Sequence, residues 1–89
     1  AKFDHALGAG VTAADLQRYD DAGRWLDTAL AQRPGDITAT LELARVKLGM
    51  DDYRQARRLA LQVLAAYPDS QLADDLRRQA EAKLSATVD

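Results

Sequence analysis

The stretch YRQARRLALQVLAAYP, residues 53–68, decides the fold, because the stretch YDDAGRWLDTALAQRP, residues 19–34, is an imperfect earlier copy of it. Aligned at an offset of 34 positions, the two copies share Tyr19 with Tyr53, Ala22 with Ala56, Arg24 with Arg58, Leu30 with Leu64, Ala31 with Ala65 and Pro34 with Pro68. A fixed period of roughly 20 to 50 residues is typical of stacked supersecondary units, none of which can bury its apolar face alone. The sequence therefore predicts a repeat protein.

Length and composition limit the chain to one small domain. Its 89 residues have room for a single modest core, and none of them is a cysteine that could form a disulfide or a thiolate metal site. A net charge of -2 provides no basic surface for nucleic acid. No apolar run approaches the roughly 20 residues of a membrane span. We expect one soluble domain over residues 1–89, with no nucleic acid partner, no cofactor and no direct membrane insertion.

The start of the chain and its composition give weaker indications of origin. The chain begins with Ala1 rather than Met and shows no charged-then-apolar leader, so we expect a mature form or a fragment. Abundant Ala, with Arg and Asp as the main charged residues, hints at a GC-rich bacterial gene. The bacterial cytoplasm and the periplasm both remain open.

Apolar residues at helical spacing predict five helices, over residues 3–15, 19–32, 37–48, 53–66 and 71–84. The first helix contains Gly8 and Gly10, and each costs about 1 kcal/mol relative to Ala in a helix interior. We expect these glycines to lie where two helices cross closely. The faces expected to be buried in the first, second and fourth helices are Phe3, Leu7, Gly10 and Ala14, then Ala22, Leu26, Ala29 and Leu30, then Ala56, Ala60, Val63 and Leu64.

Capping and helix-breaking residues mark the boundaries of these helices. Pro34 and Pro68 end the second and fourth helices, because the residue before a proline avoids the helical region. Gly49 is expected in a left-handed position that closes the third helix. The residues expected to cap helix N-termini are Asp36, Asp52 and either Asp69 or Ser70.

The third and fifth helices differ in how much of their surface is apolar. The third helix carries two apolar stripes and a single polar stripe, made of Thr38, Glu42 and Arg45, which predicts neighbours on both sides in the middle of a stack. The fifth helix has one apolar stripe and a charged remainder, as in a terminal capping helix. Its stripe is Leu72, Ala73, Leu76, Ala80 and Leu84. Residues 85–89 are expected to form a frayed tail.

Two helices per 34 residues with a closing proline resemble the tetratricopeptide repeat family. The residues that carry the resemblance are Gly10, Ala22, Leu26, Ala29 and Pro34 in the first repeat, and Leu43, Ala44, Ala56 and Pro68 in the second. The chain departs from the pattern at Ala6, Ala9, Ala13, Ala60 and Val63. The resemblance implies an all-α, right-handed solenoid with repeats over about residues 3–36 and 37–70 and a capping helix over about 71–85.

The chemistry-bearing residues do not predict catalysis. His5 is the only histidine and is expected to be exposed and idle, which leaves no Ser-His-Asp arrangement and no His-based metal site. The adjacent carboxylates Asp20-Asp21, Asp51-Asp52 and Asp74-Asp75 are expected in the first turns of helices. There a negative charge interacts favourably with the helix dipole, and a carboxylate can cap the helix N-terminus. No glycine-rich phosphate loop follows a strand. We expect no catalytic, cofactor-binding or metal-binding residue and no enzymatic activity.

The resemblance implies a non-enzymatic scaffold that binds a peptide or helix of a partner protein in a concave groove. Together with the polar stripe, the family's groove positions give Leu7, Val11, Thr38, Leu41, Glu42, Arg45, Leu72, Asp75 and Gln79 as partner-binding residues. Chaperone-binding members hold acidic tails with Lys and Asn at positions where this chain has Leu7 and Val11, so we expect no such clamp. The alternatives are the repeat portion of a bacterial cell-envelope assembly or exopolysaccharide export protein, and a homo-oligomerisation module.

Trp25 is off the main apolar stripe of its helix, and its equivalent one repeat later is Leu59. Either the two side chains touch on the convex side as a small packing contact, or they form an exposed apolar patch that marks an interface. The sequence favours the packing contact over the patch.

Overall fold

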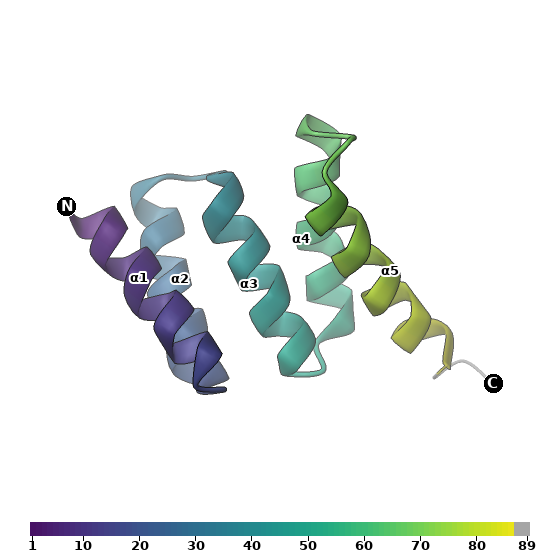
Figure 1. Ribbon diagram of the computed structural model, residues 1–89, viewed down its shortest axis with the longest axis horizontal. Coiled ribbons are helices and arrows are strands. Elements are labelled where there is room, and N and C mark those ends of the chain that lie inside the picture. The colour runs from purple at the N-terminus through teal and green to yellow at the C-terminus, as the bar shows by residue number, and fades with distance from the viewer. Residues whose placement is uncertain (87–89) are drawn as a thin grey trace.

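The computed structural model describes residues 1–86, which form five α-helices in chain order (Figure 1). The helices are α1 (Lys2–Asp15), α2 (Tyr19–Gln32), α3 (Ile37–Gly49), α4 (Tyr53–Ala66) and α5 (Gln71–Ala86). Each predicted helix is present, and boundaries differ by at most two residues. Ser85 and Ala86, predicted to lie in a frayed tail, extend α5 instead, and the rest of that predicted tail lies outside the described residues.

Neighbouring helices pack as antiparallel pairs in a single curved row (Figure 1). Each helix contacts the next one along the chain, and α3 also contacts α1 and α5. No Cα atom of α2 lies within 8 Å of a Cα atom of α4, and both helices are wholly described. The odd-numbered helices therefore line the inner side of the row and the even-numbered helices spread apart on the outer side. The chain is an all-α helical-repeat solenoid of two helical hairpins and a C-terminal helix.

The turns that follow α1 and α3 have the same geometry, and both are built on a residue with positive φ. Gln17 has φ 60° and Asp51, 34 positions later, has φ 61°. After α1, the N–H of Gln17 donates to the carbonyl of Ala14 and the N–H of Arg18 donates to that of Ala13, which is a Schellman motif. The prediction that Gly49 takes the left-handed position was wrong, because Gly49 lies inside α3.

The N-terminal caps of α3, α4 and α5 are formed by residues that the sequence predicted as caps. Backbone N–H groups donate to the side chains of Asp36, Asp52 and Ser70, from Ala39 (3.0 Å), Gln55 (3.3 Å) and Ala73 (3.2 Å) respectively. Ser70 rather than Asp69 is therefore the cap of α5. The N-cap position of α2 holds Arg18, whose side chain accepts no such bond.

Small residues set the close approach of paired helices. Ala22 and Ala56 are fully buried at equivalent positions of α2 and α4. Gly10 lies against Leu26, and a Cβ added there would be 2.8 Å from the Leu26 Cγ, so the prediction of a close crossing is confirmed at this glycine. It was wrong for Gly8, which has no neighbouring atom within 4 Å of such a Cβ.

The second hairpin stacks on the first through α3. Leu43 and Val46 are buried in one core cluster with Leu26 of α2 and Leu59 of α4. Thr40 is also buried, and its hydroxyl group donates to the backbone carbonyl of Asp36 over 2.7 Å, so the polar group remains satisfied. Helix α3 therefore has packed neighbours on both sides, as its two apolar stripes predicted.

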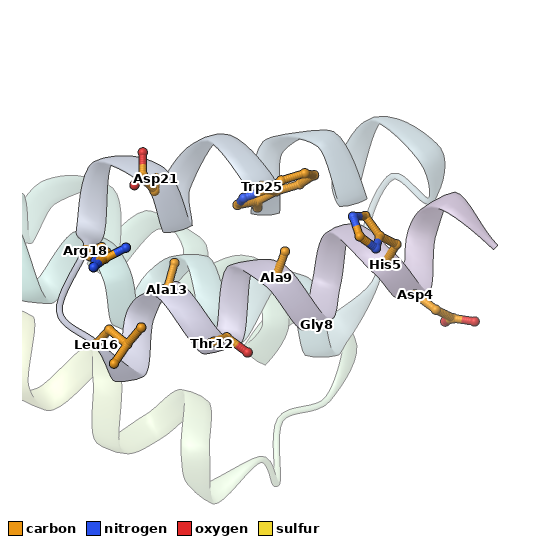
Figure 2. A pocket seen from close by; sticks show the side chains of 10 residues that line it. All are labelled: Asp4, His5, Gly8, Ala9, Thr12, Ala13, Leu16, Arg18, Asp21 and Trp25. Carbon is orange, nitrogen blue, oxygen red and sulfur yellow. The ribbon is translucent and has the colours of Figure 1, made fainter.

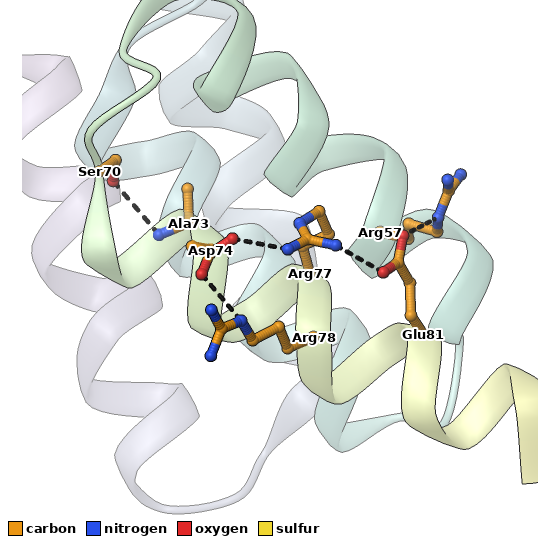
Figure 3. A network of polar contacts seen from close by, with 7 residues as sticks. All are labelled: Arg57, Ser70, Ala73, Asp74, Arg77, Arg78 and Glu81. Atoms are coloured by element: carbon orange, nitrogen blue, oxygen red, sulfur yellow. Dashed lines mark hydrogen bonds and ion pairs between the residues drawn. The ribbon is translucent and has the colours of Figure 1, made fainter.

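Helix α5 closes the row through buried alanines and an ionic network. Ala73 and Ala80 are fully buried, whereas Leu72, predicted to belong to the same packed stripe, is 66% exposed. Figure 3 shows the polar contacts on the outer surface of α5 and their link to α4. Arg57 Nε of α4 lies 2.8 Å from Glu81 Oε2, and the network continues through Arg77, Asp74 and Arg78.

Candidate partner-binding groove

A hollow of about 330 Å³ lies between α3 and α5 on the inner side of the row. Its lining is Leu41, Glu42, Arg45, Leu48, Leu72, Asp75, Leu76 and Gln79. The structure thus brings together six of the nine residues predicted to bind a partner: Leu41, Glu42, Arg45, Leu72, Asp75 and Gln79. We call the hollow, with all eight of its lining residues, the α3–α5 groove.

Helical spacing explains why these side chains converge. On α3, Leu41, Arg45 and Leu48 follow one another at steps of four and three residues, which places them along one face. On α5, Leu72, Asp75, Leu76 and Gln79 repeat the pattern. Because α3 and α5 contact each other, the two faces form the walls of one hollow. Leu72 is exposed there, so aliphatic surface is open to a ligand.

Arg45 is the cation among the groove-lining residues, and its guanidinium is already bonded to carboxylates. Its Nη2 lies 2.7 Å from Glu42 Oε2 and 3.4 Å from Asp15 Oδ1, and its Nε donates to the same Glu42 oxygen over 3.1 Å. The bond to Glu42 is the main reason that the pKa of Arg45 is raised above its usual value. Arg45 therefore connects α3 to the end of α1 and stays charged.

Asp75 occupies a repeat position where the earlier helices carry leucine. The equivalents at offsets of 34 and 68 are Leu41 and Leu7. Asp75 is exposed, and within residues 1–86 it takes part in none of the salt bridges found. The groove therefore changes from aliphatic on α3 to acidic on α5 at the same structural position.

Three predicted groove residues lie outside this hollow. Leu7 and Val11 on α1 are half-buried, and Leu7 packs against both core clusters. Thr38 is exposed near the start of α3. These three residues therefore do not line the α3–α5 groove.

The sequence reasoning missed Leu48, Leu76 and Asp15 as contributors to this region. Leu48 and Leu76 complete the aliphatic lining. Both could have been predicted, because Leu48 follows Arg45 by three residues and Leu76 follows Leu72 by four, which places each pair on one helix face. Asp15 pairs with Arg45 across 30 positions of sequence, for which the sequence offered no signal.

A second candidate surface lies on the first hairpin, where residues of α1 and α2 surround Trp25 (Figure 2). Two hollows of about 510 and 500 Å³ share Trp25 and His5 in their linings. The rings of these two residues are 5.3 Å apart and nearly perpendicular, an edge-to-face contact. His5 is exposed, as predicted, and its ring contacts that of Trp25.

Leu59 does not share this surface with Trp25. Leu59 is 7% exposed and belongs to the core cluster under α3, whereas Trp25 is 38% exposed and lies outside that cluster. The predicted Trp25–Leu59 patch was wrong, because Leu59 is buried in a cluster with residues of α2 and α3, whereas no described helix precedes the first hairpin and packs on Trp25 in the same way. The sequence favoured a packing contact between Trp25 and Leu59, but Trp25 is not a member of the core cluster that contains Leu59.

Residues 1–86 contain neither a metal-binding cluster nor a membrane-spanning helix. No group of three or more metal-ligating side chains comes together in that part of the chain. None of its helices combines the length and apolar character needed to cross a membrane. The α3–α5 groove offers aliphatic side chains, carboxylates and an ion-paired guanidinium, which are groups that can bind a ligand through packing and charge.

Comparison with known proteins agrees with the repeat geometry. A family model described as tetratricopeptide repeat matches residues 13–80, which include the end of α1, all of α2, α3 and α4, and part of α5. No significant match was found among curated proteins or among solved structures. The chain belongs to the tetratricopeptide repeat family. Repeats of this family generally mediate protein–protein interaction and generally act as non-enzymatic scaffolds.

Proposed function

We propose that this chain is a scaffold domain that binds a peptide or helix of a partner protein in the α3–α5 groove. The observation that carries the proposal is the exposure of Leu72, at 66%, in a hollow whose walls also include Leu41, Leu48 and Leu76. Exposed aliphatic side chains gathered in a concave surface are typical of partner-binding sites. We take the binding unit to be one domain, with repeats over about residues 3–36 and 37–70 and a closing helix from about residue 71.

Acidic chaperone tails are not the proposed ligand. The first repeat places Leu7 and Val11 where a carboxylate clamp would need Lys and Asn, and Arg45 is already paired with two carboxylates. A ligand carboxylate would have to compete with Glu42 and Asp15 for this guanidinium. Tight binding of an acidic C-terminal peptide in calorimetry would contradict this part of the proposal.

The test uses selection and a matched pair of variants. Peptides are selected from a phage-displayed random library on the immobilised domain, and the affinity of a selected peptide is measured by calorimetry. Leu72→Glu places a charge in the groove, whereas Leu61→Glu makes the same substitution at an exposed leucine of the outer helix α4. We expect Leu72→Glu to abolish binding and Leu61→Glu to preserve it.

The double variant Leu41→Glu with Arg45→Glu tests the α3 wall of the groove. Loss of binding in this variant, with helical content retained in circular dichroism, supports the proposed site. A library that yields no binding peptide, or a peptide whose affinity is the same for wild type and for Leu72→Glu, overturns it.

Self-association is a second candidate function, and the surface around Trp25 favours it. Trp25 is exposed between two hollows, and tryptophan is enriched among the residues that dominate interface energies. If this surface joins two copies, sedimentation velocity will show a mass that rises with concentration, and Trp25→Glu will abolish the rise. A mass that stays monomeric at all concentrations rejects this candidate.

A further inference from the structure

We infer that the ligand of the α3–α5 groove carries a Lys or Arg side chain that pairs with Asp75, next to an aliphatic residue that packs on Leu72. This inference rests on the proposed function, since it specifies the chemistry of the peptide that the groove binds. Three features carry it: the ion pairs of Arg45, the carboxylate of Asp75, which has no salt bridge within residues 1–86, and the distribution of leucines.

Arg45 leaves little positive charge available to a ligand. Its guanidinium is held by Glu42 within its own helix and by Asp15 at the end of α1. The three side chains together carry a net negative charge, because two carboxylates face one guanidinium. An incoming carboxylate would meet that negative charge, whereas an incoming ammonium or guanidinium would be attracted.

Asp75 adds a carboxylate whose charge is not neutralised by a salt bridge within residues 1–86. Its neighbour Asp74 contrasts with it, since Asp74 is paired with both Arg77 and Arg78 on the outer surface of α5 (Figure 3). Arg77 and Arg78 of α5 therefore form salt bridges with Asp74 and Glu81 rather than with Asp75. Asp75 is left as the acidic group of the groove wall that can take a cation from outside.

The leucines place the aliphatic part of the ligand beside that cation. Leu72 precedes Asp75 by three residues on α5, so their side chains are neighbours on the helix surface, with Cβ atoms roughly 5–6 Å apart. A ligand in contact with both therefore needs its basic and aliphatic groups at a similar separation. Neighbouring positions on one face of a helix, or alternate positions of an extended strand, satisfy this spacing.

A basic residue at the other end of the groove fixes the orientation. Lys83 lines an adjoining hollow that shares Leu48 and Gln79 with the groove. A cationic ligand group is repelled by Lys83 and attracted by Asp75, so the basic residue of the ligand lies at the Leu72 end. Asp51 also lines that adjoining hollow, and the hydrogen bond that its carboxylate accepts from the Tyr53 hydroxyl over 2.8 Å comes from a neutral donor and leaves it negatively charged. The charges of Asp51 and Lys83 therefore offset each other there, and a cation gains more beside Asp75.

The experiment uses the peptides selected on the intact domain. In one selected peptide the basic residue is changed to Gln and to Glu, and each version is titrated with wild type, Asp75→Asn, Asp75→Lys and Asp27→Lys. Asp27 is an exposed carboxylate on the outer helix α2, so Asp27→Lys changes the net charge as Asp75→Lys does, but away from the groove. The titrations are repeated at high salt.

We expect Lys or Arg to be enriched among the selected peptides, and replacement of the basic residue by Glu to weaken binding to wild type roughly three- to tenfold at low salt. Asp75→Lys should reverse this preference, Asp75→Asn should reduce it, and Asp27→Lys should leave it unchanged. Salt should reduce the difference.

The outcomes separate this inference from the proposed function. Peptides that bind through Leu72 without any enrichment of basic residues, or with the same charge preference in wild type and Asp75→Lys, overturn the inference and leave the proposed groove intact. Reversal by Asp27→Lys as well as by Asp75→Lys also overturns it, because the effect then follows net charge. Failure to select any peptide overturns both.

Discussion

Gly10 of α1 lies directly against Leu26 of α2, so closely that a Cβ at position 10 would be 2.8 Å from Leu26 Cγ and 2.9 Å from its Cδ2. Leu26 is fully buried, so it can move aside only by displacing its packed neighbours. The first hairpin therefore depends on the absence of a side chain at this point. The glycine is retained despite its low helix propensity because it permits the crossing.

We expect Gly10→Ala to destabilise the protein by about 1–2 kcal/mol, since overpacking in the core outweighs the gain in helix propensity. Gly8→Ala is the matched control in the same helix, and it should stabilise the protein by roughly 0.5–1 kcal/mol because nothing approaches position 8. Urea unfolding followed by circular dichroism measures both. Equal effects of the two substitutions would contradict the crossing argument.

Gln17→Gly should stabilise the protein by about 1 kcal/mol. Gln17 has φ 60° in the turn after α1, a conformation that costs a residue with a side chain roughly 1–2 kcal/mol and costs glycine very little. The control is Gln62→Gly on the exposed side of α4, where glycine should instead destabilise by about 1 kcal/mol. Opposite signs in thermal unfolding are expected, and a loss of stability in Gln17→Gly would be inconsistent with the observed turn.

Arg18→Ser should stabilise α2 by about 1 kcal/mol relative to Arg18→Ala. Position 18 is an N-cap without a side-chain acceptor, whereas Asp52 at the equivalent position of α4 accepts from a backbone N–H. Both substitutions remove the positive charge from the helix N-terminus, so their difference in unfolding free energy isolates the cap. If the two variants are equally stable, α2 does not begin where the structure places it.

The fold was predictable because its determinants repeat along the chain. The period of 34 residues, the apolar spacing and the prolines located all five helices, and the family positions located Leu41, Arg45 and Asp75 in one groove. The positive φ of Gln17 and Asp51, which are 34 positions apart, was not predicted, because neither residue is a glycine. Gly49 was misplaced because a glycine near a helix end is usually read as a left-handed cap.

The features that could not be predicted depend on contacts between residues of different helices, which the sequence pattern of a single helix does not specify. Trp25 and Leu59 are equivalent in the repeat, yet Leu59 is buried and Trp25 is exposed, since α2 precedes the second hairpin and no described helix precedes the first. The pair of Arg45 with Asp15 is another case, because it joins two helices that meet only in the folded chain. Equivalent positions have equivalent backbones but different surroundings.

Acidification should weaken the attachment of α5, and Glu81→Gln should remove part of that pH dependence. The hydrogen bond from Arg57 is the main reason that the pKa of Glu81 is lowered in the folded protein. A carboxylate whose pKa is lower when folded stabilises the protein at pH values above its unfolded pKa of about 4.3, and this contribution is lost as the pH falls through the folded pKa. Asp74 behaves in the same way, because the bond from Arg77 lowers its pKa.

Urea unfolding of wild type and Glu81→Gln between neutral pH and about pH 3 tests this expectation. Wild type should be the more stable at neutral pH, and the difference between the two proteins should shrink on acidification, because Glu81 becomes protonated and its ion pairs with Arg57 and Arg77 are lost. Asp27→Asn, at a carboxylate outside the salt bridges found in residues 1–86, is the control and should show a smaller change with pH. A Glu81→Gln difference that stays constant or grows toward low pH would show that this carboxylate does not hold α5 to α4.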